Sequence, residues 1–307
     1  MTAVATRADA TRDLSSGAEL AAIGVLTMAG QRDLTERVRA YPDLFAGKPF
    51  DAALIGGVAY ATACNMTWAT SAELRVANRA ALWVFALDWQ VDTLAVAAEQ
   101  VDEIAANCLA VADGAVPGPG SPLAGFLADI RDELVTAPAF AAYAPLWRAD
   151  LRRTLAAMSR EWGWKSARAA GEESGLPDVD TYLDAADNTG LSWVNLSHWL
   201  RTGEPDCLDV LDELRSAGER VQRVLRLVND LATYDRDVSW GGGDLNVLML
   251  GVDRAWVAGR VAELVDGCLE LIAPLRTSCP REASYLARQL GFVTRFYGGG
   301  ADFWGRL

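Results

Sequence analysis

The chain has little of what builds a disulfide framework or a histidine-based site. Its five cysteines are scattered, their number is odd, no two form a CxxC pair, and there is one histidine. The spacing gives no indication of disulfides or zinc, and hydrolase triads and histidine-based metal sites find no support. We expect His198 to be structural. We expect the protein to be cytoplasmic, because scattered cysteines suit a reducing compartment and the N-terminus lacks an apolar signal-peptide core.

Basic residues are also few. Lysine and arginine number 28 against 41 aspartates and glutamates, and the formal net charge is −13. Nucleic acids and anionic membranes are bound by clustered lysine and arginine, so this charge argues against both kinds of partner. An anionic substrate would have to be held by a few local basic residues.

Strand signals are scarce, and the one candidate membrane span is weak. Ala, Leu, Arg and Glu dominate long stretches, and there is no series of alternating segments joined by Asn-Gly or Asp-Gly turns. Residues 52–72 carry no charged side chain and approach the roughly 20 residues that span a bilayer. Their glycines, threonines and Asn65 favour a buried helix instead. We therefore expect an all-α protein without a membrane span.

A hydrophobic content of 51% in 307 residues is sufficient for a large core. The breaks rich in Gly and Pro are short for domain linkers, so we expect one all-α domain over residues 16–307, after a polar segment, residues 1–15, predicted to be disordered. The run Gly241–Gly243 is either a helix C-cap and connector or a mobile loop. The expected helices cover residues 17–40, 51–69, 71–112, 121–136, 139–163, 178–201, 206–237, 252–275 and 281–297.

The clearest chemical signal is the stretch RLVNDLATYDRD, residues 226–237. Asn229, Thr233 and Asp237 recur every four residues, which at about 100° per residue places an amide, a hydroxyl and a carboxylate on nearly one face of a helix. Oxygen donors grouped in this way suit a hard divalent cation such as Mg²⁺. Asp230 projects from another face and is left out of the expected ligand set.

A pair of acids lies far upstream. Asp88 and Asp92 are four residues apart in the largely apolar segment ALWVFALDWQVDTLAVAA. Buried carboxylates must be paired, protonated or bound to metal, because unpaired buried charge is costly. The two segments together suggest a metal site between facing helices; the alternative is a pair of acids at the solvated end of a core helix.

These two segments resemble the metal-binding motifs of class I terpene synthases. The family's motif N-D-x-x-S/T-x-x-x-E is matched by residues 229–237, with Asp237 where Glu is usual, and its DDxxD motif by residues 88–92, with Trp89 in place of the second Asp. Chain length and motif order also fit single-domain bacterial members. The resemblance implies an all-α, single-domain helical bundle of the class I terpene synthase (isoprenoid synthase) type. It also implies up to three bound Mg²⁺ ions, for which Mn²⁺ can substitute.

The resemblance also implies roles for individual residues, and the segment Arg295-Phe296-Tyr297 resembles the family's Arg-Tyr pair with one residue inserted. The expected catalytic residues, which are also metal ligands, are Asp88, Asn229, Thr233 and Asp237, with Asp92 as a further ligand. The expected diphosphate-binding residues are Arg226, Arg236, Arg295 and Tyr297. The aromatic residues expected near the pocket, where they would stabilise a carbocation, are Phe85, Trp89, Trp193, Trp199, Phe296 and Trp304.

One expected feature of the family is missing. Upstream of its second motif the family often places a diphosphate-sensing arginine before a helix break, and the corresponding residues 182–190 contain no arginine. Gly190 is the expected break. Either another arginine replaces the sensor, or ionisation is triggered differently.

The resemblance implies a lyase that ionises an allylic prenyl diphosphate. A C20 substrate is favoured: geranylgeranyl diphosphate, or a bicyclic terpenyl diphosphate made by a separate class II diterpene cyclase. A farnesyl-using sesquiterpene synthase, a prenyl-condensing enzyme and a non-catalytic helical interaction protein are the alternatives. A homodimer is compatible with the sequence.

Overall fold

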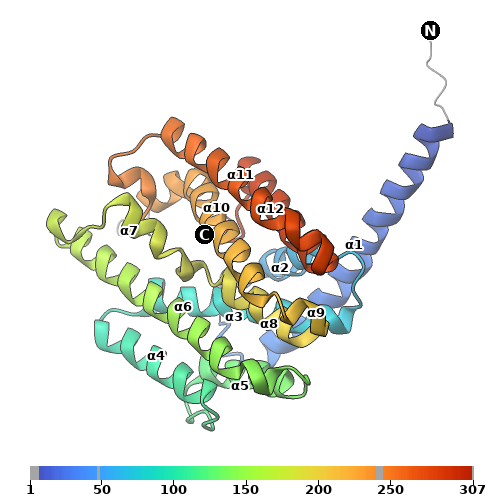
Figure 1. Ribbon diagram of the computed structural model, residues 1–307. Helices are drawn as coiled ribbons and strands as arrows, with labels where there is room; N and C mark the ends of the chain where they lie inside the picture. Colours follow the sequence, from blue (N-terminus) through green and yellow to red (C-terminus); the bar gives the residue numbers. More distant parts are fainter. Residues whose placement is uncertain (1–6, 47–48, 240–244, 306–307) are drawn as a thin grey trace.

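The computed structural model describes residues 7–46, 49–239 and 245–305, and every regular element within them is a helix (Figure 1). The predicted all-α fold is therefore confirmed. The elements are α1 (Arg7–Ala40), α2 (Ala52–Asn65), α3 (Ser71–Trp89), η1 (Gln90–Leu94), α4 (Ala98–Ala112), α5 (Pro122–Val135), α6 (Phe140–Ala169), η2 (Glu173–Gly175), α7 (Val179–Asp184), η3 (Ala186–Thr189), α8 (Leu191–Thr202), α9 (Pro205–Leu208), α10 (Leu211–Ser239), η4 (Val247–Leu250), α11 (Arg254–Ser278) and α12 (Pro280–Gly298).

Local chemistry fixes several of the helix starts. The carboxylate of Asp51 accepts the backbone N–H groups of the first turn of α2, and Asp253 caps α11 in the same way. Thr70 and Glu73 form a reciprocal capping box at the start of α3. Such caps satisfy backbone donors that have no partner inside the helix. They place the start of α3, and therefore the register of its acidic residues.

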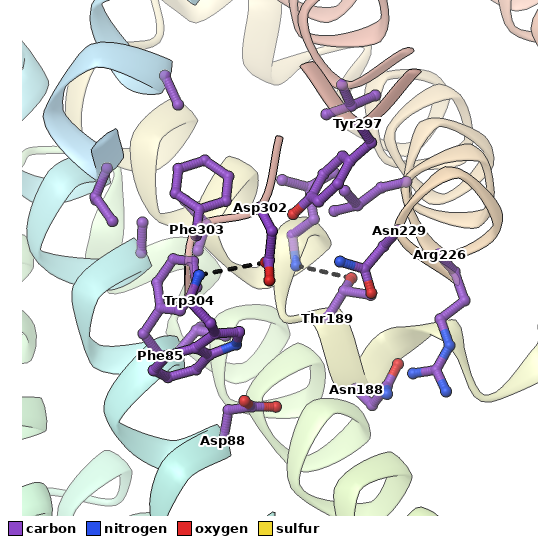
Figure 2. Close-up of a pocket in the computed structure, with 18 of the residues that line it drawn as sticks. Phe85, Asp88, Asn188, Thr189, Arg226, Asn229, Tyr297, Asp302, Phe303 and Trp304 are labelled. Atoms are coloured by element: carbon purple, nitrogen blue, oxygen red, sulfur yellow. Dashed lines mark hydrogen bonds between the residues drawn. The ribbon is translucent and has the colours of Figure 1, made fainter. Parts of the chain in front are cut away.

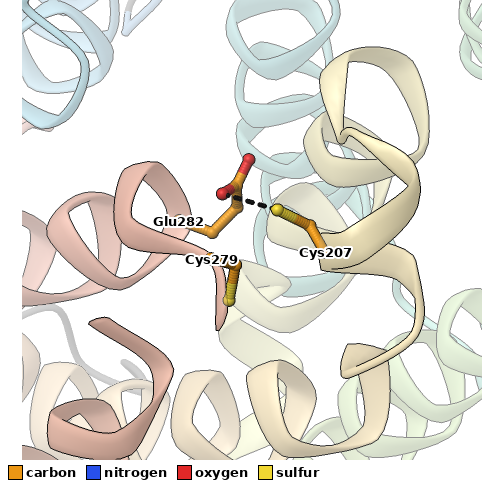
Figure 3. A group of neighbouring side chains, drawn as sticks. All are labelled: Cys207, Cys279 and Glu282. Carbon is orange, nitrogen blue, oxygen red and sulfur yellow. Dashed lines mark hydrogen bonds between the residues drawn. The ribbon is translucent and has the colours of Figure 1, made fainter. Parts of the chain in front are cut away.

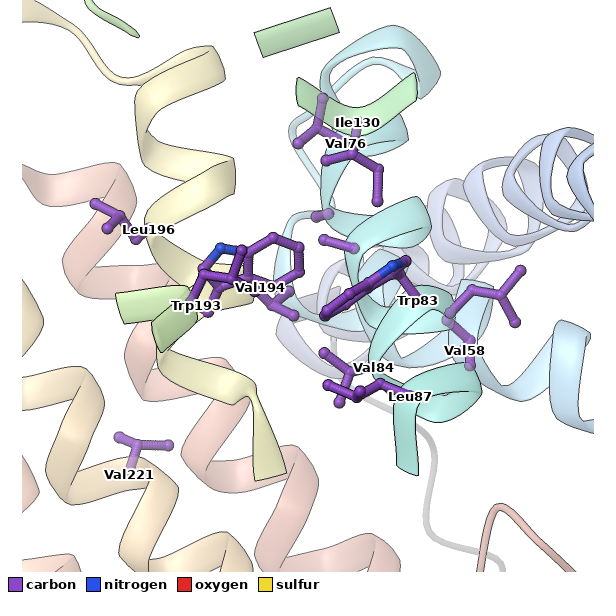
Figure 4. Packing of buried hydrophobic residues seen from close by; sticks show 14 of the residues in the cluster. Val58, Val76, Trp83, Val84, Leu87, Ile130, Trp193, Val194, Leu196 and Val221 are labelled. Carbon is purple, nitrogen blue, oxygen red and sulfur yellow. The ribbon is translucent and has the colours of Figure 1, made fainter. Parts of the chain in front are cut away.

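Helix α3 lies at the centre of the core. It packs against α1, α2, α5 and α8, while α10 packs against α8, α11 and α12. Between α3 and α8 the indole rings of Trp83 and Trp193 lie 5.0 Å apart (Figure 4). The ring of Trp147 of α6 lies 5.5 Å from that of Trp193. All three tryptophans are fully buried. This aromatic packing joins α3, which carries the first motif, to α6 and α8, and α8 in turn packs against α10, which carries the second.

The predicted helix bounds differ from the structure at several places. The helix expected over residues 206–237 is two helices, α9 and α10, and the one expected over 51–69 ends at Asn65. The single helix expected over residues 71–112 is divided into α3, the π-helical η1 and α4, and the one expected over 178–201 is broken at Gly190. At the N-terminus α1 begins at Arg7 rather than at residue 17. Residues 1–6 of the segment predicted to be disordered, and the run Gly241–Gly243, lie outside the described residues. Periodicity alone missed these breaks because a π-turn and a short kink leave the apolar pattern almost unchanged.

Among the described residues, none of the helices has both the length and the apolar character that a bilayer crossing requires. The uncharged stretch 52–72 instead contains α2, which ends at Asn65. Thr62 and Asn65 are buried on this helix and face a pocket.

His198 is buried in α8, and the hydroxyl of Thr202 lies 3.3 Å from its Nδ1. Burial lowers the pKa of His198 to about 4, with a small opposing effect of Glu73. Below its ordinary pKa of about 6.5 the unfolded chain therefore binds a proton that the folded chain does not. Stability contributed by the neutral ring is present above pH 6.5 and is lost as the pH falls towards 4.

Between pH 6.5 and 4 the free energy of unfolding of the wild type should fall more steeply than that of the His198→Gln variant, by up to about 3 kcal/mol over the whole range. Denaturant unfolding at half-unit pH steps would measure the difference. The chain has one histidine, so the variant has none. The carboxylates are the same in both proteins, and their contribution cancels in the difference between the two pH profiles. Parallel pH profiles would contradict the assignment.

Candidate active site

A cavity of about 220 Å³ lies among α2, α3, α8, α10 and α12 (Figure 2). Apolar side chains such as Val58, Val84 and Phe292 form much of its wall, whereas its polar end contains the amide of Asn229 together with Asp88 and several further charged groups. In Figure 2 Asp88 projects from α3 and Asn229 from α10, on opposite sides of this end. An apolar chamber with a charged end suits a ligand that has an apolar body and an ionic head.

On α10 the second motif is held by hydrogen bonds. The Thr233 hydroxyl donates to the backbone carbonyl of Asn229 at 3.0 Å and lies 2.8 Å from Oδ2 of Asp237. The side chain of Asn246 donates to the same Oδ2 at 2.9 Å. Asn229 and Asp237 line the cavity, and Thr233 is buried beside them. The structure thus brings Asn229 and Asp237 to the cavity, where Thr233 orients Asp237.

The first motif spans a change of helix type. Asp88 lies in the last turn of α3, and Asp92 lies in the π-helix η1, and both line the cavity. The carboxylate of Asp92 pairs with Lys165 of α6 at 3.0 Å. Single π-turns occur often at functional sites, because they rotate side chains away from the positions of a regular α-helix. The pairing with Lys165 engages one oxygen of the Asp92 carboxylate.

The donor set at the polar end fits a hard divalent cation. Asp88, Asn229 and Asp237 offer carboxylate and amide oxygens in one cavity, and oxygen ligands are those preferred by Mg²⁺ and Mn²⁺. Thiol and imidazole groups are absent from the described residues that line the cavity. These three residues are the ones that would hold metal ions.

Arg226 is buried in a network of hydrogen bonds. Its guanidinium pairs with Glu161 of α6, donates to the Tyr182 hydroxyl at 2.7 Å and lies over the Tyr182 ring at 4.3 Å. The Tyr182 hydroxyl also contacts Asp230, whose pKa is raised to about 7, mainly by burial. Asp230 was expected to project from another face of its helix, but it also lines the cavity, and its carboxylate accepts hydrogen bonds from Tyr182 and the backbone of Val247. Although Arg226 lines the cavity, most of its donors are used inside the protein.

Arg236 joins the second motif to the C-terminal segment. Its guanidinium lies 3.3 Å from Asp237 and pairs with Asp302, which follows α12. Asp302 also accepts a hydrogen bond from the backbone of Trp304 (Figure 2). Asp302, Phe303 and Trp304 all line the cavity, so the segment after α12 covers part of it.

Arg295 and Tyr297 have different positions on α12. Tyr297 is buried and lines the cavity, and burial together with the carboxylate of Asp302 raises the pKa of its hydroxyl. Arg295 is exposed and is not among the cavity residues. Residues two positions apart on an α-helix point about 200° apart, so the inserted Phe296 places Arg295 on the opposite side. Its expected role in diphosphate binding has no support from this position.

The six expected pocket aromatics fall into three groups. Phe85 and Trp304 line the cavity, with ring centroids 5.2 Å apart. Trp89 contacts Trp304 at 5.9 Å, and Phe296 contacts Phe303 at 4.7 Å, so both support the cavity wall from behind. Trp193 and Trp199 are buried in the core and do not line it.

The helix break expected at Gly190 is present. Gly190 has φ 65°, a left-handed conformation, between η3 and α8, and Asn188 and Thr189 directly before it line the cavity. Asn188 donates to Glu161, the partner of Arg226. The arginine missing from this segment is therefore not replaced locally, but Arg226 reaches the same region from α10.

We expect Gly190→Ala to destabilise the fold by about 2–4 kcal/mol. A Cβ atom there would lie 2.6 Å from Cγ2 of Val84, and the positive φ is itself unfavourable for alanine. Denaturant unfolding would measure the change. The double variant Gly190→Ala/Val84→Ala removes the clash but not the backbone strain, so a variant as stable as Val84→Ala alone would contradict this account.

Several cavity residues carry no signal in the sequence. Glu161, Asn188 and Asp302 are isolated polar residues outside both motifs, and only the nearby Gly190 break points to Asn188. They reach the cavity through contacts between distant helices.

Comparison with known proteins agrees with this geometry. The profile described as "Terpene synthase family 2, C-terminal metal binding" matches residues 79–254. The chain belongs to the terpene synthase family, whose members are lyases acting on prenyl diphosphates. It is 29% identical to the ent-pimara-9(11),15-diene synthase of Streptomyces sp. (strain KO-3988), an alignment that covers 89% of this chain and 90% of that protein.

Solved structures show the same fold at low sequence identity. The linalool/nerolidol synthase of Streptomyces clavuligerus superposes with a TM-score of 0.68 at 19% identity, covering 92% of this chain and 96% of that one. The germacradien-4-ol synthase of Streptomyces citricolor gives a TM-score of 0.64 at 16% identity, covering 91% and 93%. The expected class I terpene synthase fold is therefore confirmed.

Proposed function

We propose that the protein is a Mg²⁺-dependent class I terpene synthase that ionises an allylic C20 diphosphate and releases diphosphate and a terpene hydrocarbon or alcohol. The observation that carries the proposal is one cavity with an apolar wall and a polar end, at which Asp88 faces Asn229 and Asp237 from another helix. The expectation of a single domain over residues 16–307 forms part of the proposal.

At the polar end the oxygens of Asp88, Asn229 and Asp237 would hold the metal ions. When bound, such ions stabilise the negative charge that develops on the departing diphosphate. Thr233 keeps Asp237 oriented, because its hydroxyl lies 2.8 Å from the Asp237 carboxylate. Asp92 is a further ligand candidate if its pairing with Lys165 opens. Mn²⁺ would suit the same donors.

Arg236 is the cation best placed to contact the leaving group. Both arginines line the cavity and pair with acidic residues, but the side chain of Arg236 is 17% exposed and that of Arg226 is 9% exposed. The buried hydroxyl of Tyr297 stays protonated, because its pKa is raised, and can donate a hydrogen bond to a phosphate oxygen.

The apolar wall would shape the carbocation. Phe85 and Trp304 offer aromatic faces without a nucleophile, and such faces attract a nearby cation. With Phe303 they also limit the access of water, which would otherwise quench the cation to an alcohol. No described side chain is assigned as a general base, and released diphosphate is a candidate for that role.

The proposed size of the substrate rests on the similarity of this chain to known proteins. The Streptomyces relative is named as a pimaradiene synthase, which favours a diterpene substrate. The C20 substrate is either linear geranylgeranyl diphosphate or a bicyclic diphosphate from a separate class II cyclase, and the altered first motif fits both. The solved neighbours include a linalool/nerolidol synthase, which keeps farnesyl diphosphate as an alternative substrate.

The test is incubation of the purified protein with geranyl, farnesyl, geranylgeranyl and bicyclic diterpenyl diphosphates, with Mg²⁺ or with chelator, followed by gas chromatography and mass spectrometry. A terpene formed from a C20 substrate only when Mg²⁺ is present is the expected result. A product from farnesyl diphosphate alone would overturn the substrate proposal. No product from any substrate, with folded protein, would overturn the enzymatic one.

Trp304→Ala is expected to lower kcat/KM by about tenfold and to raise the alcohol fraction of the product. The Trp304 ring packs against Phe50, Phe85 and Trp89, so its removal opens the cavity to water. The ratio of alcohol to hydrocarbon measures this directly. Trp256→Ala, at an exposed position on α11, is the control. An unchanged ratio in Trp304→Ala would contradict the proposed exclusion of water.

A further inference from the structure

Three possible metal ligands meet where α9 lies against the start of α12 (Figure 3). Cys207 belongs to α9, Cys279 directly precedes α12, and Glu282 lies in its first turn. The two thiol sulfurs and a carboxylate oxygen all lie within 4.8 Å of one another, and all three residues are buried. None of the three lines the candidate active site. The cluster is therefore separate from the proposed Mg²⁺ ligands.

Glu282 is a buried carboxylate that lacks a cation. Its recorded hydrogen bond is the one donated by Cys207 Sγ to Oε2 at 3.0 Å. In the part of the chain that the structure describes, no lysine, arginine or histidine forms an ion pair with it. A buried charge without a partner is costly, and a weak thiol donor offsets little of that cost. The cluster thus has a carboxylate and two soft donors but lacks positive charge.

We propose that Cys207, Cys279 and Glu282 bind a thiophilic divalent cation of the Zn²⁺ type. Two cysteine sulfurs and one carboxylate oxygen are a donor set that Zn²⁺ accepts and that Mg²⁺ disfavours. Binding replaces the two thiol protons by one dication. The net charge of the cluster, −1 from the carboxylate, is therefore the same before and after binding.

The geometry needs only a small change. Tetrahedral coordination at zinc bond lengths places neighbouring sulfur and oxygen ligands roughly 3.5–4 Å apart. The present separations reach at most 4.8 Å, so a small inward rotation of the side chains would close the site. With three protein ligands, the fourth tetrahedral position would be taken by a water molecule.

Metal binding suits these thiols better than redox chemistry. Burial raises the pKa of Cys207 and of Cys279, so both are neutral and poorly nucleophilic at neutral pH. The consequence of binding is mechanical. The ion would join α9, which leads into α10 and its motif, to α12, which carries Tyr297. It would thus tie α12, which lines the active site, to the short helix that directly precedes α10.

Titration of the reduced protein with Co²⁺, in the presence of excess Mg²⁺, tests the proposal. We expect a thiolate-to-cobalt charge-transfer band that Zn²⁺ abolishes, and a Tm raised by about 4 °C at a hundredfold excess of Zn²⁺ over its dissociation constant. Cys207→Ser and Cys279→Ser should each lose the band, and Glu282→Gln should weaken Co²⁺ binding at least tenfold. Cys268→Ser, at another buried cysteine, is the matched control and should keep it.

The metal-free Tm of each variant separates loss of binding from loss of fold. Absence of the band in folded wild-type protein would overturn the proposal, and so would a band that survives in Cys207→Ser and Cys279→Ser. A Cys207–Cys279 disulfide formed with hydrogen peroxide, in protein that does not bind Co²⁺, would overturn it in favour of a redox pair.

Discussion

Replacing Asp237 by asparagine is expected to lower kcat by about 10³-fold while leaving the fold intact. Asparagine has the same shape, so the contacts of this residue with Thr233 and Asn246 can be partly kept. The change removes one negative charge from the donor set that would hold the metal ions, and such charges determine ion affinity. Without the ions the departing diphosphate loses several kcal/mol of stabilisation in the transition state.

The matched control is Asp235→Asn, which makes the same chemical change two residues away on the exposed face of α10. It should retain wild-type activity. Steady-state kinetics at several Mg²⁺ concentrations, together with Mg²⁺ binding measured in the presence of inorganic pyrophosphate, would separate loss of metal from loss of substrate binding. Equal activity of the two variants would exclude Asp237 as a ligand.

The largest stability effect is expected from Arg226→Met, which should destabilise the fold by about 3–5 kcal/mol and lower Tm by about 5–10 °C. Arg226 is 7% exposed and pairs with Glu161, which is 5% exposed. The variant would remove the Arg226 guanidinium, and the hydrogen bonds that it donates, from the buried Glu161 carboxylate. The weaker compensation of that buried charge, rather than the strength of the pair itself, causes the loss.

Two further variants test this reason. Arg223→Met removes an arginine from the same helix, but its pair with Asp184 is largely exposed, so we expect little change. The double variant Arg226→Met/Glu161→Gln should recover part of the lost stability, because Glu161 is then neutral, although buried Asp230 still loses its ion pair with Arg226 at 3.7 Å. If kcat recovers as well, Arg226 is structural; if only Tm recovers, Arg226 also contacts the diphosphate. A double variant no more stable than Arg226→Met would contradict the charge argument.

Features that depend on a single helix were predicted from the sequence, whereas contacts between distant helices were not. The four-residue spacing of Asn229, Thr233 and Asp237 depends on one helix, and the structure places all three on one side of α10. The position of Asp88 also follows from its helix. Asp92 lines the same cavity as Asp88, but the spacing did not predict that it lies in a π-helix and pairs with Lys165. The π-turn has no periodic signature.

The arginines show why a residue type and a sequence position do not fix a role. Arg295 and Arg226 were both expected to bind diphosphate. Arg295 is exposed because of the helical phase of α12, and Arg226 is engaged by a glutamate 65 residues away. The same holds for Trp193, which packs in the core with Trp83 and Trp147 rather than along the cavity.

The sequence by itself determined the all-helical fold, the family and the oxygen donors of the two motifs, because these depend on composition and on spacing along single helices. The tertiary structure alone decided which side chains meet: Asp302 with Arg236, Arg226 with Glu161, and Cys207 with Glu282. Each of these contacts joins two segments far apart in the chain. Local periodicity specifies which face of a helix is buried, but only the packing of helices against one another specifies what that face contacts.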